Sequence, residues 1–98
     1  MFRHVVMFDW NDDVDEAQVE SIARVLESRV AVLPTVAAYR HGPDAGLADG
    51  NADYVIVADF ASVDDYVEYR DHPDHQAVIA EHLKPAIAAR NAVQYETA

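Results

Sequence analysis

The segment FRHVVMFDW, residues 2–10, sets the architecture that we expect for this chain. Successive side chains of a β-strand point to opposite faces, and here large apolar residues occupy both alternating sets. A strand with two apolar faces needs cover on both of them. The first set is Phe2, His4, Val6, Phe8 and Trp10, and the second is Arg3, Val5, Met7 and Asp9.

A helix is predicted next, over residues 15–33. Its apolar residues are spaced by three or four positions, which places them in one continuous stripe. These residues are Val19, Ile22, Leu26, Val30 and Leu33. Asp15 is a good N-cap for this helix, and Pro34 ends it because proline lacks the backbone donor.

The rest of the chain alternates between strand-like and helical segments. Ser62 resembles the start of a capping box, and the His72-Pro73 pair divides the second helix into two pieces. All three glycines fall in one long loop between two strands. The predicted elements are a strand over 35–41, the loop over 42–52, a strand over 53–60, helical pieces over 63–70 and 73–83, and a strand over 90–96.

The element order is therefore β-α-β-β-α-β within a single domain, residues 1–98. This order is typical of a ferredoxin-like α+β fold, with a four-stranded antiparallel sheet and both helices on one face. The other sheet face would leave apolar residues in water, and a second copy of the chain is the simplest cover. We therefore expect a homodimer.

Composition restricts the partners. Eighteen Asp and Glu against seven Lys and Arg give a net charge of −11, which argues against nucleic acid and anionic membrane surfaces. The chain has no cysteine, so disulfides and thiolate chemistry are excluded. It also lacks a membrane-spanning apolar run and a signal-peptide layout, so we expect an acidic, soluble, cytoplasmic protein.

Three side chains are candidates for chemistry. His75 falls on the apolar side of the 73–83 helix, where its imidazole can act as a general base at neutral pH, or can simply bond to a backbone group. Tyr69 can donate a hydrogen bond to a developing oxyanion, or can be a core aromatic residue. His4 lies on the apolar face of its strand and can line a ligand pocket or be a satisfied core residue. His72 is expected to cap a helix, and His41 and His82 to be surface residues.

No metal site and no cofactor are predicted. His75 and His82 are two helical turns apart, roughly 10 Å, which is too far to hold one ion. The glycines of the loop do not follow the spacing of a phosphate-binding loop.

Three segments resemble the stress-responsive A/B barrel domain (Dabb) family. They are FRHVVMF at 2–8, DYVIVADFAS at 53–62 and YVEYRDHPDH at 66–75, the last matching a Tyr-x-x-His-Pro-x-His signature. The resemblance implies a dimeric α/β barrel in which two subunits contribute eight strands. The family's best-known enzyme, olivetolic acid cyclase, closes a linear tetraketide by an aldol reaction. The resemblance implies that His75 and Tyr69 stand at its active positions and His4 at its early strand histidine.

Three hypotheses follow. The first is a cofactor-free cyclase or lyase that acts on a polyketide-like or phenolic acid, with His75 as base, Tyr69 as oxyanion donor and His4 as a ligand-binding residue. The second is a non-catalytic dimeric domain that binds a metabolite or a protein. The third is a monooxygenase of the dimeric α+β barrel type, which rests on analogy of fold. The sequence leaves open whether the chain is an enzyme.

Overall fold

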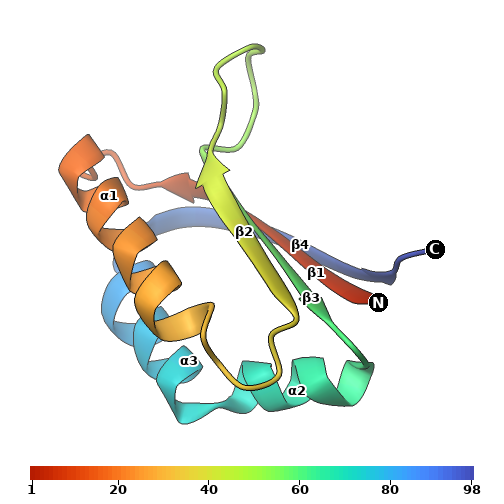
Figure 1. The fold of residues 1–98 in the computed structure, drawn as a ribbon. Coiled ribbons are helices and arrows are strands. Elements are labelled where there is room, and N and C mark those ends of the chain that lie inside the picture. The colour runs from red at the N-terminus through yellow and green to blue at the C-terminus, as the bar shows by residue number, and fades with distance from the viewer.

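A computed structural model describes residues 1–98 as one antiparallel sheet covered by helices (Figure 1). The strands alternate with helical segments in the order expected from the sequence. Both long helical segments end in a wide π-helical turn, labelled η. The elements are β1 (Phe2–Trp10), α1 (Glu16–Val25), η1 (Leu26–Val30), β2 (Ala38–Pro43), β3 (Tyr54–Phe60), α2 (Val63–Asp71), α3 (Pro73–Val78), η2 (Ile79–Leu83) and β4 (Ile87–Glu96).

The strand order across the sheet is β2-β3-β1-β4, and every neighbouring pair is antiparallel. This arrangement confirms the predicted four-stranded ferredoxin-like fold. His4 pairs with Ala58 of β3 on one side and with Gln94 of β4 on the other. The N-terminal strand is therefore central, so residues close to both ends of the sequence meet beside it.

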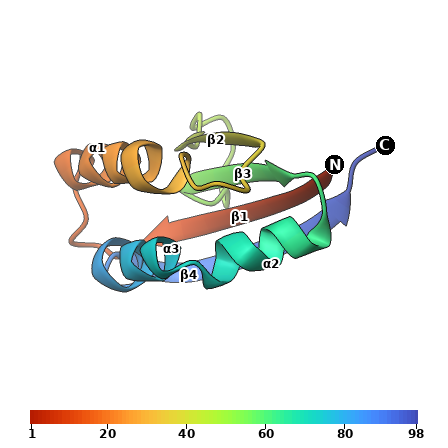
Figure 2. The same cartoon turned by 60° about the horizontal axis from the view of Figure 1, so that its bottom comes forward.

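The helices lie against one face of the sheet and bury one of the two alternating sets of β1 (Figure 2). Val6 and Phe8 are buried there with Ile56 and Phe60 of β3. The helices contribute a matching apolar layer, because the predicted stripe of α1 and η1 faces the sheet. Its buried members are Ile22, Leu26 and Val30. The core thus lies between the sheet and the helices.

The other face of the sheet has no cover within one chain. A row of valines crosses it, because Val5 pairs with Val57 of β3 and with Val93 of β4. Val93 is 55% exposed and the neighbouring Met7 is 42% exposed. We call the row Val5, Val57 and Val93 the outer valine row. It is the second apolar face of β1 that the sequence predicted.

Four element boundaries differ from the prediction by two residues or more. β4 begins at Ile87 rather than at residue 90, because its pairing with β1 continues to Trp10, and β2 ends at Pro43 rather than at residue 41. The first helical segment ends at Val30 rather than at residue 33, since Leu33 precedes Pro34 and is disfavoured in helical geometry. The second strand begins at Ala38 rather than at residue 35. Thr35 instead lies in the connection, where its hydroxyl donates to the carbonyl of Asp65 at 2.8 Å. The local sequence pattern could not reveal this contact with α2, because Thr35 and Asp65 lie 30 positions apart.

The predicted helix starts are confirmed. The side chains of Asp15 and Ser62 accept hydrogen bonds from the backbone N–H groups of Gln18 and Asp65, as N-caps do. His72 also caps a helix, because its Nδ1 accepts from the N–H of Asp74 at 3.1 Å. Pro73 opens α3, a position that needs no backbone donor. Among the helices, none combines the length and apolar character that crossing a membrane would require.

Candidate functional site

A cavity of about 390 Å³ lies between the helices and the sheet. Such a volume is within the range of small-molecule pockets. Its walls are mostly aliphatic and aromatic, and strands β1–β4 and helices α2 and α3 all contribute to them. The three candidate residues of the sequence, His4, Tyr69 and His75, all line it. Residues far apart in the chain therefore meet at one site.

The two π-helical turns shape this cavity. In η1 the N–H of Ala31 donates to the carbonyl of Leu26 five residues back, and in η2 Lys84 donates to Ile79 in the same way, at 2.9 and 2.8 Å. Each wide turn places two aliphatic side chains in the cavity wall: Leu26 and Val30 from η1, and Ile79 and Leu83 from η2. Local π-helical turns are often found at functional sites.

His75 stands in the first turn of α3 with one ring nitrogen fixed. Its Nδ1 lies 3.0 Å from the carbonyl oxygen of Arg70, which can only accept a hydrogen bond. Nδ1 therefore carries the proton, and Nε2 of the neutral ring keeps a free lone pair. Burial lowers the pKa of His75 below its ordinary value and outweighs the hydrogen bond to the Arg70 carbonyl, which raises it; the positive charge of Arg90 adds to the effect of burial. The ring is thus neutral at pH 7 and can accept a proton through Nε2.

Tyr69 stacks on this imidazole. The two ring centroids are 4.2 Å apart, with 37° between the ring planes. Tyr69 is buried, and burial raises the pKa of its phenol, so the hydroxyl stays protonated and able to donate. A hydrogen-bond donor and a proton acceptor therefore lie side by side in the cavity wall.

Tyr39 of β2 adds a second phenol. Burial strongly raises its pKa, and the neighbouring phenol of Tyr69 acts in the same direction. Although the two hydroxyls influence each other, no hydrogen bond of ordinary geometry joins them, and the buried Tyr39 hydroxyl has no partner. A buried hydroxyl without a partner needs a water or a ligand to satisfy it.

His4 reaches the cavity from β1. Its Nδ1 lies 2.9 Å from the side-chain amide of Gln94, and an amide N–H donates there, so the proton of the neutral ring sits on Nε2. Burial lowers the pKa of His4 to about 4, with smaller contributions from Arg90 and His75. His4 is therefore a neutral donor at pH 7, whereas His75 is a neutral acceptor.

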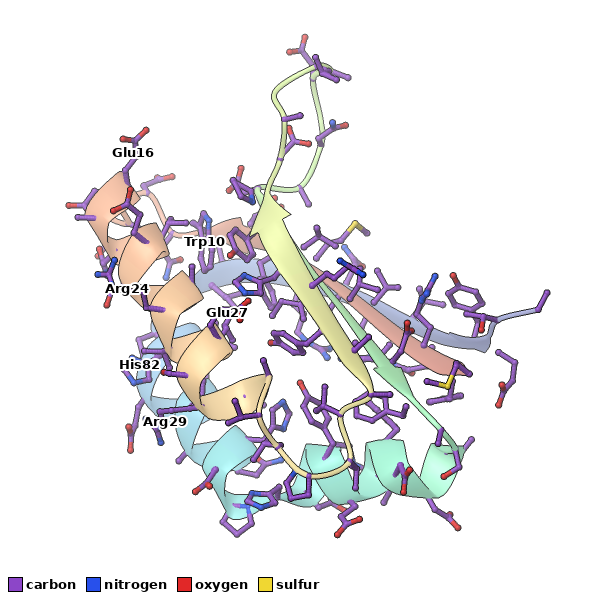
Figure 3. All side chains as sticks on the ribbon, in the orientation of Figure 1. Trp10, Glu16, Arg24, Glu27, Arg29 and His82 are labelled. Carbon is purple, nitrogen blue, oxygen red and sulfur yellow. The ribbon has the colours of Figure 1, made fainter.

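No set of three His, Asp or Glu side chains is grouped closely enough to hold one metal ion. His82 lies 34% exposed beside Glu81, which agrees with its prediction as a surface residue. The prediction for His41 is wrong. Its side chain is only 8% exposed and bridges two elements, with Nε2 2.6 Å from Glu27 and Nδ1 2.6 Å from the Tyr54 hydroxyl. Figure 3 shows Glu27 on the helix that faces β2.

A family model described as the stress responsive A/B barrel domain matches residues 2–97. The chain belongs to this family. The match covers nearly every residue, and it confirms the family that the three sequence segments indicated. A comparison with curated proteins returned no match.

Solved structures similar to this A/B barrel domain share its fold. A dimeric ferredoxin-like protein of unknown function from Thermobifida fusca YX is 42% identical, with 98% of this chain and 90% of that chain covered and a TM-score of 0.91. A Dabb family protein from Mesorhizobium loti MAFF303099 is 18% identical, covering 99% and 96%, with a TM-score of 0.86. A hydroxynitrile lyase from Passiflora edulis is 21% identical, covering 96% and 90%, with a TM-score of 0.81. The last two comparisons show the fold alone.

Sequence reasoning missed part of the site in this A/B barrel domain. Tyr39, Lys84 and Arg90 line the cavity, but none stands in a recognisable motif. Tyr39 shares its strand face with His41, and that alternation in an Ala-rich segment was the one available signal. Arg90 lies opposite Phe8 only because β4 pairs with β1, which requires the sheet order.

Proposed function

We propose that this chain binds a small, partly apolar carbonyl compound in the cavity and removes a proton from the carbon beside the carbonyl without a cofactor. An aldol-type cyclisation of a polyketide-like acid begins with this step, and the reverse lyase reaction ends with its reversal, the return of a proton to the enolate carbon. The observation that carries the proposal is the tautomer of His75. Its Nδ1 is held by the Arg70 carbonyl, which leaves Nε2 without a hydrogen-bond partner, and the imidazole lies against the ring of Tyr69.

In this mechanism His75 Nε2 takes the proton and the electron pair of the C–H bond becomes an enolate. The Arg70 carbonyl stabilises the imidazolium that forms, as an orienting acceptor does in other catalytic histidine sites. The enolate carbon then attacks a second carbonyl of the same molecule. The imidazolium returns its proton to the new alkoxide, so no net proton is consumed.

In the proposed mechanism Tyr69 stabilises the enolate oxygen. Its phenol keeps its proton, because burial raises its pKa, and it donates a hydrogen bond where negative charge develops. The partnerless Tyr39 hydroxyl supports a ligand in the same place, since a carbonyl group would satisfy it. His4 donates from Nε2 and orients the ligand.

We propose in addition that the protein is a homodimer. The outer valine row supports this, because an uncovered apolar sheet face is a typical subunit interface. The structure from Thermobifida fusca, at 42% identity, is described as dimeric. Packing of two such faces would give the eight-stranded barrel that the family resemblance implies.

The second candidate function is ligand binding without turnover. The cavity and the partnerless Tyr39 hydroxyl favour a ligand equally well in this case. The two functions differ in one outcome only, which is whether His75 moves a proton. The monooxygenase hypothesis has no observation of its own at this site and stays a prediction.

Isotope exchange tests the proposal directly. Phenylacetone is incubated with the protein in deuterated buffer at pD 7.5, and proton NMR follows loss of signal from the carbons beside its carbonyl. We expect exchange above the buffer rate, about 10²- to 10⁴-fold slower in His75→Ala because the general base is lost. Tyr69→Phe should slow it about 10²-fold.

His82→Ala is the matched control, since His82 lies outside the cavity on the same helical segment. Circular dichroism confirms that each variant is folded. Exchange at the same rate in wild type and in folded His75→Ala would refute the role of His75 and leave ligand binding as the function.

A further inference from the structure

Positive charge is concentrated at the cavity. The chain has only seven Lys and Arg against 18 Asp and Glu. Three of those seven, Arg70, Lys84 and Arg90, line the cavity, and no Asp or Glu does. The charged side chains that line the cavity are all positive, whereas most charged side chains of this chain are negative.

Two of these cations have no partner within the protein. Arg70 pairs with Asp71, its neighbour in the chain, at 2.9 Å. Lys84 and Arg90 make no ion pair, although both are exposed and carboxylates are abundant elsewhere on the surface. Their charges are therefore free to meet an anion from solution.

Arg90 points to the helix-covered side of the sheet. It pairs with Phe8 across β1 and β4, and directly paired residues share a face; Phe8 is buried in the core on that side. The positive charge of Arg90 also contributes to the lowered pKa of both His4 and His75. Arg90 thus acts on both histidines, and it lines the cavity while remaining exposed to solvent.

We propose that the cavity binds an organic anion, with its carboxylate at Arg90 and Lys84 and its apolar part among the aliphatic and aromatic walls. Guanidinium recognises carboxylates with two parallel hydrogen bonds, and a cleft of one charge sign draws in the opposite charge. Arg90 is then a specificity-determining residue. The inference rests on the proposed function for the site, because it names the class of molecule that His75 and Tyr69 would act on.

The arrangement also gives a chemical reason for placing a cation there. A cation near His75 keeps that imidazole neutral, as a base must be before it acts. A bound carboxylate would partly cancel this effect and raise the basicity of His75 when substrate is present. Substrate binding and proton abstraction would therefore be coupled through Arg90.

A matched pair of probes tests the inference. The acid 4-phenylbutanoate and its amide, 4-phenylbutanamide, have nearly the same shape and differ in charge. Isothermal titration calorimetry on the full-length wild-type protein at pH 7.5 measures both dissociation constants. We expect the acid to bind at least tenfold more tightly than the amide, because the charged contact has no counterpart in the amide.

Arg90→Gln should remove most of that tenfold preference while leaving the affinity for the amide unchanged. Arg24→Gln is the control. Arg24 is another arginine without an ion pair, and Figure 3 shows it on α1, outside the residues that line the cavity. The Arg24→Gln variant should keep the full preference for the acid over the amide, and Arg90→Lys should keep part of that preference.

Equal affinities of wild type for the acid and the amide would overturn the anion proposal, as would an undiminished preference in folded Arg90→Gln. Neither result would touch the role of His75, which is measured by exchange on the neutral ketone. Conversely, if His75→Ala exchanged as fast as wild type, a measured preference for the acid over the amide would still support the anion proposal. Failure of both probes to bind would overturn the anion proposal together with the ligand cavity.

Discussion

His75 and His4 take opposite hydrogen-bonding roles in the cavity, and a single hydrogen bond to each ring decides which role it takes. The Arg70 carbonyl accepts from His75 and frees its Nε2 as an acceptor, whereas the Gln94 amide donates to His4 and leaves its Nε2 as a donor. Burial lowers the pKa of both rings, so both are neutral at pH 7. A neutral acceptor and a neutral donor facing one cavity are what proton abstraction from a neutral carbonyl compound requires.

The pH dependence of exchange follows from the state of His75. The base works only when the ring is neutral, and burial places its folded-state pKa below 6.5. We expect the exchange rate, corrected for buffer exchange, to be flat from pH 7 to pH 8 and to fall about tenfold per unit well below the pKa. A midpoint above pH 7, measured by the same NMR assay, would contradict the account.

Individual residues were predicted unevenly. The family resemblance covers the segments of His75, Tyr69 and His4 and indicated them as candidate site residues, and all three line the cavity. His41 was misjudged, since its partners Glu27 and Tyr54 lie 14 and 13 residues away on other elements. Arg90 was missed for the same reason, because its partner across the sheet, Phe8, lies at the opposite end of the chain.

At the scale of elements, one chain of hydrogen bonds ties η1 to β2 and β3. The Glu27 carboxylate can only accept, so His41 donates to it from Nε2, while Nδ1 of the same ring is hydrogen-bonded to the Tyr54 hydroxyl. Burial raises the pKa of Tyr54, which keeps that hydroxyl protonated. This contact holds the wide helical turn, and with it part of the cavity wall, against the edge of the sheet.

His41→Ala should therefore lower the free energy of unfolding by about 1–3 kcal/mol, because the buried Tyr54 hydroxyl loses its partner. Urea unfolding at one fixed protein concentration measures the effect. Tyr54→Phe and the double variant complete a cycle, which should show coupling of about 1 kcal/mol. Strict additivity of the two substitutions would mean that the contact contributes nothing.

Alternation and helical periodicity predicted the elements themselves well. β1, β3 and both pieces of the second helix fall within one residue of the expected bounds. The π-helical turns gave no signal, because their aliphatic side chains also fit an ordinary helical stripe. β2 was shifted because its alanines do not distinguish a buried face from an exposed one, and the contact of Thr35 with α2 sets where the strand begins.

The whole molecule has one sheet face covered by its own helices and one face open. The open face presents the outer valine row to water, with Val93 55% exposed. Burial of this apolar surface is the expected driving force for pairing of two chains.

Light scattering should therefore give twice the 10.9 kDa mass of one chain at micromolar concentration. Val57→Asp should shift the protein towards the monomer, since the pair would bury two like-charged carboxylates in place of two apolar side chains. Val32→Asp is the control, because Val32 is 69% exposed outside the sheet. A monomeric mass for wild type, or a Val57→Asp dimer of unchanged strength, would contradict the proposed interface.

The central claim is that His75 presents a neutral, unprotonated Nε2 to the cavity. Long-range ¹H–¹⁵N NMR of the imidazole side chains, titrated from pH 8 to pH 5, measures this state, and His75→Gln assigns the signals. The account predicts the Nδ1–H tautomer at pH 7, with protonation of Nε2 below pH 6.5. An Nε2–H tautomer, or a charged ring at pH 7, would contradict it.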